Sequence, residues 1–193
     1  AQVARISRDW GPVLDRMAWV SLGGGIYLSQ PGYPCDRLAA LLRDFAARHG
    51  VQVYLEPGEA AISGTAELVC TVLDVVRRDG LDIAIVDAST EAHMLDLLIY
   101  RQSAKLAEPG PGRRRVMIAG RSCLAGDVFG TYRVGRQLTV GDMVRFADAA
   151  GYTMDKKNWF NGLPMPAIVV RRLDGRTETV RQFTYEDFKS SLS

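Results

Sequence analysis

The sequence predicts a short α/β region followed by an all-β region. Over residues 18–55 a strand, a glycine-rich loop, a helix and a second strand follow one another. This order is a βαβ unit and implies parallel strands. Beyond Gly58 the apolar residues fall in short β-type runs between glycine-containing turns. Many short strands of this kind favour an antiparallel barrel or sandwich.

The α/β region begins with an amphipathic helix. Apolar side chains at helical spacing predict a helix over residues 1–17. We expect a break near Gly11 and Pro12, because proline has no amide donor and restricts the residue before it. The chain opens on Ala1 with this pattern already under way and without methionine. We therefore expect a segment of a longer protein.

A glycine triplet lies at the centre of the βαβ unit. Residues 18–22 read as a short strand that ends directly in glycines 23–25. Such a triplet lets the backbone approach an anion and present amides to it, although a flexible turn is the alternative. A helix is expected over residues 34–49, with Gly50 as its C-cap, and residues 51–55 form the second strand.

The β region contains a predicted hairpin and several further strands. Residues 68–76 and 81–87 read as strands joined by a turn at residues 77–80. We expect the loop at residues 108–112, rich in proline and glycine, to be mobile. Five more short strands are expected, at residues 116–119, 130–134, 143–147, 167–172 and 179–183.

Composition excludes several classes of function. The 193 residues are 47% hydrophobic and 24% charged with a net charge of +2, which is typical of a globular domain and gives little reason to expect a nucleic-acid partner. Cys35, Cys70 and Cys123 lie far apart, so neither a zinc site nor a disulfide framework is indicated. The apolar runs are too short to span a membrane. An odd number of cysteines without a signal sequence favours the cytoplasm.

Two carboxylates follow the strand at residues 51–55. Glu56 comes directly after it, and Glu59 follows the Pro57-Gly58 bend. Acid groups at the carboxyl end of a strand are typical of α/β-barrel active sites, because that face collects the loops. Solvated loop charges are the alternative.

Four residues of the β region could also carry chemistry. Cys123 lies among small residues at 120–127, where a thiol can donate a proton or act as a nucleophile, although a lone cysteine is more often a small buried side chain. Tyr152 could extend its hydroxyl to a phosphate or only pack its ring. Asp87 and His93 follow a predicted strand and could equally be structural.

Several motifs, taken in order, resemble those of a known family. The glycine triplet is followed by Tyr-Leu-Glu-Pro-Gly-Glu-Ala at 54–60, His-Met at 93–94, Ser-Cys-Leu-Ala-Gly-Asp at 122–127, Tyr-Thr-Met at 152–154, Phe-Asn-Gly at 160–162 and Tyr-Glu-Asp-Phe-Lys at 185–189. This order resembles the fold-type III pyridoxal-phosphate decarboxylases. Within that group the motifs are similar to the branch that acts on carboxynorspermidine and carboxyspermidine. The ornithine and diaminopimelate branches usually have arginine in place of Glu59 and an acidic residue in place of Leu124.

The resemblance implies a fold and a cofactor. Residues 1–58 would be the last βα units of an alanine-racemase-like (β/α)8 barrel, and residues 59–193 a C-terminal antiparallel β-barrel or sandwich domain. Pyridoxal 5′-phosphate would be the cofactor, with Glu56 paired to its pyridine nitrogen and Tyr152 in contact with it. The backbone that holds its phosphate would be that of Gly23, Gly24, Gly25 and Gly58.

The resemblance also implies a reaction. The whole protein would decarboxylate a carboxylated polyamine in spermidine or norspermidine synthesis. Cys123 would enter the active site of a partner subunit and return a proton to the carbon that has lost carbon dioxide, so a homodimer is implied. The cationic nitrogens of the substrate call for carboxylates. The substrate-binding candidates are Glu59, Asp87, Asp127 and His93.

One departure from the family is plain. The family's cofactor-binding lysine lies on the first barrel strand, and no counterpart is present among Lys105, Lys156, Lys157 and Lys189. Most of the eight βα units of such a barrel are also missing. We therefore expect the chain alone to be inactive. A diaminopimelate- or ornithine-type decarboxylase, and a non-catalytic remnant or regulator, are the alternatives.

Overall fold

The computed structural model describes residues 2–78, 80–108 and 110–192. The chain forms two compact units, Ala1–Ser63 and Gly64–Ser193, and each is described by itself. The boundary between residues 58 and 59 that the family resemblance implies stays a prediction. Part of the loop predicted to be mobile, at residue 109, lies outside the described residues.

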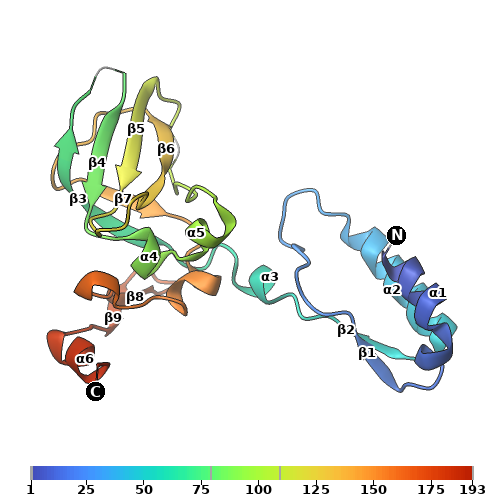
Figure 1. Ribbon diagram of the computed structural model, residues 1–193. Helices are drawn as coiled ribbons and strands as arrows, with labels where there is room; N and C mark the ends of the chain where they lie inside the picture. The colour runs from blue at the N-terminus through green and yellow to red at the C-terminus, as the bar shows by residue number, and fades with distance from the viewer. Residues whose placement is uncertain (1, 79, 109, 193) are drawn as a thin grey trace. The chain divides into compact units, whose positions relative to one another are not determined.

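The first unit is a small βαβ arrangement (Figure 1). Strands β1 and β2 pair in parallel, as the sequence predicts, with Val20 opposite Val53. Helices α1 and α2 pack against each other around Leu14, Phe45 and Val51, which form the buried core of the unit. The elements are α1 (Gln2–Leu14), β1 (Trp19–Ser21), α2 (Cys35–His49), β2 (Gln52–Tyr54) and α3 (Gly58–Ile62).

The predicted break at Gly11 and Pro12 is wrong. Helix α1 continues through Pro12 and ends at Leu14. Proline at this place lies in the last turn, where it removes only one backbone bond, and the amide of Asp15 still donates to the Gly11 carbonyl at 3.0 Å. Burial of Leu14 against α2 holds the final turn in place. The expected C-cap of α2 is confirmed, because Gly50 adopts the left-handed conformation with φ 64°.

The second unit is built on a five-stranded sheet with the strand order β6-β5-β4-β3-β7. The predicted strands are confirmed, with ends that differ by a few residues. The sheet strands are β3 (Leu68–Val76), β4 (Asp82–Val86), β5 (Arg114–Ala119), β6 (Val128–Val134) and β7 (Met143–Phe146). The other elements are α4 (Thr90–His93), α5 (Asp96–Tyr100), β8 (Ile168–Arg171), β9 (Thr177–Arg181) and α6 (Tyr185–Ser190), with short helical turns at Ala150–Met154 and Phe160–Gly162.

The sheet is mixed, so the prediction of an antiparallel β domain is wrong in one pairing. Strands β4 and β5 run parallel, with Ala84 opposite Ile118. The reason is the connection between them, which carries α4 and α5 and returns the chain to the starting edge of the sheet. The other pairings in this sheet are antiparallel, including the predicted β3–β4 hairpin.

The core of the second unit lies on one side of the curled sheet. Alternate residues of β3 are buried, at Leu68, Cys70 and Val72, as expected for a strand with one face toward the core. Phe129 and Phe146 stack at its centre with ring centroids 4.6 Å apart. This packing gives the loops at the strand ends a rigid support.

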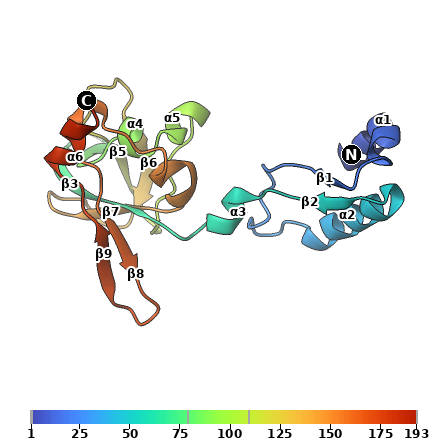
Figure 2. The ribbon, with the colours of Figure 1, turned by 90° about the horizontal axis from the view of Figure 1, so that it is seen from below.

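Strands β8 and β9 form a separate two-stranded sheet. Figure 2 shows this hairpin projecting beyond the five-stranded sheet of the same unit. The turn contains Asp174 and Gly175, as the sequence predicts, and Gly175 has φ 86°. All five residues of β9 are exposed, so the hairpin contributes little to the core.

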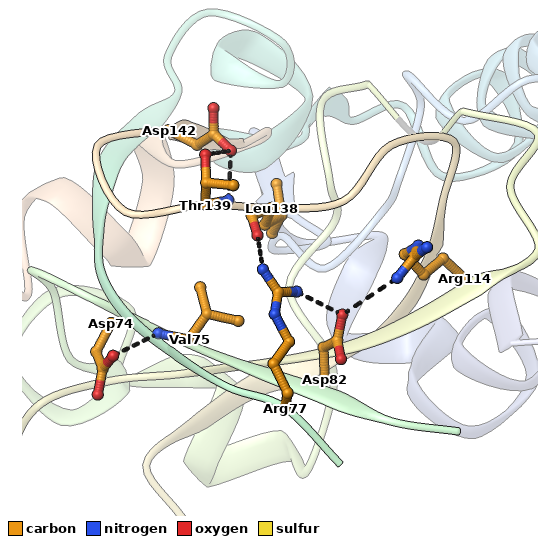
Figure 3. A network of polar contacts seen from close by, with 8 residues as sticks. All are labelled: Asp74, Val75, Arg77, Asp82, Arg114, Leu138, Thr139 and Asp142. Carbon is orange, nitrogen blue, oxygen red and sulfur yellow. Dashed lines mark hydrogen bonds and ion pairs between the residues drawn. The ribbon is translucent and has the colours of Figure 1, made fainter. Parts of the chain in front are cut away.

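An arginine joins the end of the β3–β4 hairpin to the loop before β7 (Figure 3). Arg77 donates to the Asp82 carboxylate at 2.7 Å and to the Leu138 carbonyl at 2.8 Å. Arg114 lies 3.8 Å from the same carboxylate. The β3–β4 hairpin, strand β5 and the loop before β7 are thus tied together at one end of the sheet.

Candidate functional site

The glycine triplet and the Glu56 segment lie side by side in the first unit. Strands β1 and β2 are parallel, so both segments leave the sheet at the same edge. The amide of Glu56 donates to the Gly23 carbonyl at 3.0 Å. A Cβ atom on Gly24 would lie 2.6 Å from the Glu56 carbonyl oxygen, so only glycine allows this approach. Gly23 and Gly25 have φ angles of 73° and 72°, which also favour glycine.

This edge carries donors and an acid that fit pyridoxal phosphate. The amide of Gly23 donates to the Ser21 hydroxyl, whereas those of Gly24 and Gly25 have no partner within the described residues. Free amides in a turn with alternating left-handed glycines suit a phosphate. The exposed Glu56 side chain accepts a hydrogen bond from Ser21 at 2.5 Å through one oxygen, and the other oxygen stays available for a pyridinium nitrogen. Ser21 was not among the residues predicted from the sequence; its position at the end of β1 was the available signal.

Gly58 and Glu59 begin helix α3. The Gly58 amide already donates to the Glu56 carbonyl at 2.8 Å, so this amide is engaged in the turn. Glu59 is exposed in the first turn of the helix. Its carboxylate is therefore accessible to a cationic ligand.

In the second unit Asp127 holds the loop that carries Cys123. Its buried carboxylate accepts hydrogen bonds from the Thr90 amide at 2.7 Å and hydroxyl at 2.8 Å, and from the Ser122 amide at 3.1 Å and hydroxyl at 2.6 Å. Burial alone would raise the pKa of Asp127, but these hydrogen bonds outweigh it and hold the pKa below its ordinary value. Asp127 is thus a fixed anion inside the loop.

Cys123 itself is exposed. Its amide donates to the side-chain oxygen of Asn161 at 2.8 Å. The alternative of a buried small side chain, which the sequence left open, does not apply to this cysteine. Cys35 is exposed as well, whereas Cys70 is buried in β3. Burial, and next the negative charge of Asp87, raise the pKa of the Cys70 thiol strongly.

Asp87 and His93 lie near one another in the loop and short helix after β4. Asp87 is half-buried and accepts a hydrogen bond from the Thr71 amide at 2.8 Å. His93 is buried, and its Nδ1 atom accepts from the Ser89 amide at 3.1 Å. Burial lowers the pKa of His93, although the Pro164 carbonyl and the acids Asp127 and Asp87 oppose this.

Tyr152 lies in a helical turn rather than a strand. Its backbone is left-handed, with φ 51°, and its side chain is exposed. The ammonium group of Lys156 lies 4.8 Å from the ring centroid and donates to Asp96 at 2.6 Å. The ring is therefore supported on one face by a cation.

The predicted site residues fall into two groups, one in each unit. In the first unit the structure brings together the glycine triplet, Glu56 and Gly58, with Glu59 on the next turn. In the second unit the Asp127 carboxylate and the Cys123 loop are joined, and both are anchored on α4. Within the described residues there is no cluster of three or more potential metal ligands. No helix in the described part of the chain is long and apolar enough to cross a membrane.

Comparisons with known proteins find similarity to pyridoxal-dependent decarboxylases. A profile of the family "Pyridoxal-dependent decarboxylase, C-terminal sheet domain" matches residues 60–150. A carboxynorspermidine/carboxyspermidine decarboxylase of Herminiimonas arsenicoxydans is 48% identical over all of this chain and 52% of its own length. A carboxyaminopropylagmatine decarboxylase of Synechocystis is 37% identical over 98% of this chain and 50% of its own length.

A solved structure supports the same assignment. The carboxynorspermidine decarboxylase of Campylobacter jejuni, in complex with norspermidine, superposes with a TM-score of 0.87 at 32% identity, covering 96% of this chain and 54% of that one. The chain spans about half the length of the relatives it matches. Over residues 60–150 the chain matches the C-terminal sheet domain of the pyridoxal-dependent decarboxylases, and over its whole length it is similar to carboxynorspermidine/carboxyspermidine decarboxylases.

Proposed function

We propose that this chain is the C-terminal half of a decarboxylase that converts carboxynorspermidine or carboxyspermidine to norspermidine or spermidine in polyamine synthesis. The observation that carries the proposal is the 48% identity to a relative of that name over the whole chain. In this proposal residues 1–58 complete a (β/α)8 barrel. Residues 59–193 form the C-terminal β domain, closed as a barrel or sandwich.

The cofactor assignment rests on the edge of the β1–β2 sheet. The free amides of Gly24 and Gly25 would hold the phosphate, with Gly23 setting the turn, and the engaged amide of Gly58 would support it indirectly. Glu56, oriented by Ser21, would keep the pyridine nitrogen protonated, and Tyr152 would complete the contact. When bound, pyridoxal phosphate withdraws electrons from the carbon that loses carbon dioxide. The lysine that attaches it would come from a part of the protein outside this chain.

Cys123 is the proposed proton donor. Its thiol is exposed on a loop that Asp127 fixes from within. A donor on the surface of its own subunit can serve the active site of a partner, so we propose a homodimer with shared sites. We also expect the protein to act in the cytoplasm, where thiols stay reduced.

Glu59 is the residue on which substrate choice most depends. It is exposed at the start of α3, whereas the carboxylates of Asp87 and Asp127 already accept backbone hydrogen bonds, and His93 is buried. A free carboxylate favours a cationic nitrogen and disfavours the second carboxylate of diaminopimelate. Asp87, Asp127 and His93 would then shape the substrate pocket without being its main cation ligands.

A second candidate substrate is carboxyaminopropylagmatine. The Synechocystis relative supports it at 37% identity. The guanidinium group of such a substrate would also pair with Glu59, because a carboxylate accepts two parallel hydrogen bonds from it. Diaminopimelate or ornithine decarboxylation and a non-catalytic role complete the alternatives.

Carbon dioxide release by the full-length protein, loaded with pyridoxal phosphate, separates these functions. The substrates to compare are carboxynorspermidine, carboxyspermidine, carboxyaminopropylagmatine, diaminopimelate and ornithine. We expect turnover of carboxynorspermidine or carboxyspermidine, with the highest kcat/KM of the series, and none by the chain alone. A higher kcat/KM for carboxyaminopropylagmatine would select the second candidate. Preference for diaminopimelate or ornithine, or no turnover at all, would refute the proposal.

A further inference from the structure

A continuous set of hydrogen bonds surrounds helix α4 and ends on Cys123. On one side Thr90, the first residue of α4, donates to Asp127, which in turn holds Ser122 next to Cys123. On the other side the amide of Asn158 donates to the Ala92 carbonyl at 2.9 Å, and its side chain donates to the Glu91 carbonyl at 2.9 Å. The short helix thus anchors two segments that are far apart in the sequence.

The second segment leads to Asn161. The side-chain oxygen of Asn158 accepts a hydrogen bond from the Phe160 amide at 2.8 Å, which fixes the turn at Phe160–Gly162. The side-chain oxygen of Asn161 in this turn accepts a hydrogen bond from the Cys123 amide at 2.8 Å. The set of bonds therefore closes on the backbone of Cys123.

The backbone at Asn161 has an unusual conformation. Its φ is 57°, and that of the following Gly162 is 66°. A left-handed conformation costs free energy for any residue with a Cβ, and asparagine is among the few that accept it. Such strained positions persist where the surrounding structure requires them. In this turn the left-handed backbone of Asn161 occurs together with its side-chain bond to the Cys123 amide.

We propose that Asn161 is a positioning residue for Cys123. It fixes the backbone from which the thiol projects, while Asp127 fixes the preceding residue, so that the thiol is presented to the reacting carbon in one orientation. The inference rests on the proposed role of Cys123 as proton donor. It assigns to Asn161 no contact with substrate or cofactor.

Three substitutions in the full-length protein separate the hydrogen bond from the backbone conformation. Asn161→Gly keeps the left-handed turn accessible and removes the side chain that carries the acceptor. Asn161→Asp keeps an acceptor of the same shape. Cys123→Ala removes the thiol and provides the background for the double variant Asn161→Gly with Cys123→Ala.

Two readouts are needed, and the first does not depend on activity. Hydrogen exchange of the Cys123 amide should accelerate about three- to tenfold in Asn161→Gly, the size of one lost hydrogen bond, and stay near wild type in Asn161→Asp. The kcat for decarboxylation should fall by a similar factor in Asn161→Gly with little change in KM. The kcat of Asn161→Asp should stay near the wild-type value.

The double variant shows whether Asn161 acts through the thiol. If it does, adding Asn161→Gly to Cys123→Ala slows turnover no further. An additional slowing, or unchanged exchange and kcat in Asn161→Gly, would overturn the inference. If Cys123→Ala itself turned over at the wild-type rate, the proposed proton donor would be wrong and the inference would fall with it. If Cys123→Ala were slow and Asn161→Gly turned over at the wild-type rate, only the role of Asn161 would be refuted.

Discussion

The three cysteines differ in burial, and therefore in the reactivity expected of their thiols. Cys70 makes part of the core of the second unit and is 1% exposed, whereas Cys35 and Cys123 are exposed. Burial and the charge of Asp87 raise the pKa of the Cys70 thiol. Since the thiolate is the reactive form, Cys70 is protected because reagents cannot reach it and because its thiol stays protonated.

Alkylation under native conditions tests this separation. We expect iodoacetamide to modify Cys35 and Cys123 at pH 8, and to modify Cys70 only after the protein is unfolded in denaturant. Peptide mass spectrometry distinguishes the three sites. Rapid native modification of Cys70 would show that β3 does not have the packing described.

Asp127 links pH to stability. Because hydrogen bonds hold its folded-state pKa below the ordinary value of 3.8, its stabilising contribution is fully present above that value and is lost as the pH falls toward the folded-state pKa. We expect the free energy of unfolding, measured in urea, to fall more steeply below pH 4 in wild type than in Asp127→Asn. Asp127→Ala should cost about 3 kcal/mol at pH 7, because four donors lose a charged acceptor.

The exposed Asp155 offers a matched control for that measurement. Asp155→Asn removes the same charge from an exposed position, where no donor to the carboxylate is found among the described residues. Its unfolding free energy should follow the wild-type pH dependence. If Asp127→Asn and Asp155→Asn behaved alike, the buried hydrogen bonds would contribute nothing specific.

At the scale of elements, Arg77 ties the β3–β4 hairpin to a loop that is distant in the sequence. It spans from the end of β3 to the start of β4 and to the loop before β7. The two groups to which it donates, the Asp82 carboxylate and the Leu138 carbonyl, are well shielded from water. Such a bond contributes more than an exposed ion pair.

Substitution of Arg77 by methionine measures this contribution. Arg77→Met keeps most of the aliphatic length and should lower the free energy of unfolding by about 1–2 kcal/mol. The neighbouring Arg78 is exposed, and no side-chain ion pair is present for it within the described residues, so Arg78→Met should change stability by less than about 0.5 kcal/mol. Equal effects of the two substitutions would contradict the stabilising role of the Arg77 hydrogen bonds.

Much of the secondary structure could be predicted from the sequence, and the failures have physical reasons. Strand β3 and the cap at Gly50 follow from local patterns of side-chain alternation and backbone preference. The course of α1 through Pro12 depends on packing against α2, which the local pattern does not contain. The parallel pairing of β4 with β5 depends on a long connection, and pairing over such distances leaves no local signal.

The candidate site was predictable to a similar degree. Glu56 and the glycine triplet are recognisable because strand ends collect functional groups, and the structure places them together. Ser21 and Asn161 were missed as partners, since their roles arise from contacts between segments distant in the sequence. The interior position of Asp127 likewise depends on α4, whose place the sequence did not reveal.

At the scale of the whole molecule, the two units divide the proposed chemistry. The first would bind the cofactor through its glycine edge and Glu56, and the second would supply the Cys123 proton donor to a partner subunit. The chain spans about half the length of its relatives, and none of its lysines lies in β1 or β2. The proposed chemistry therefore requires Cys123 to act in the full-length protein.

The most direct test is the turnover of carboxynorspermidine by full-length Cys123→Ala, compared with wild type and with Cys35→Ala. Both cysteines are exposed, so Cys35→Ala controls for the loss of a surface thiol. A general acid contributes about 100-fold or more to a rate. We predict that kcat for release of norspermidine falls by about this factor in Cys123→Ala and is unchanged in Cys35→Ala. Wild-type turnover by Cys123→Ala would contradict the account.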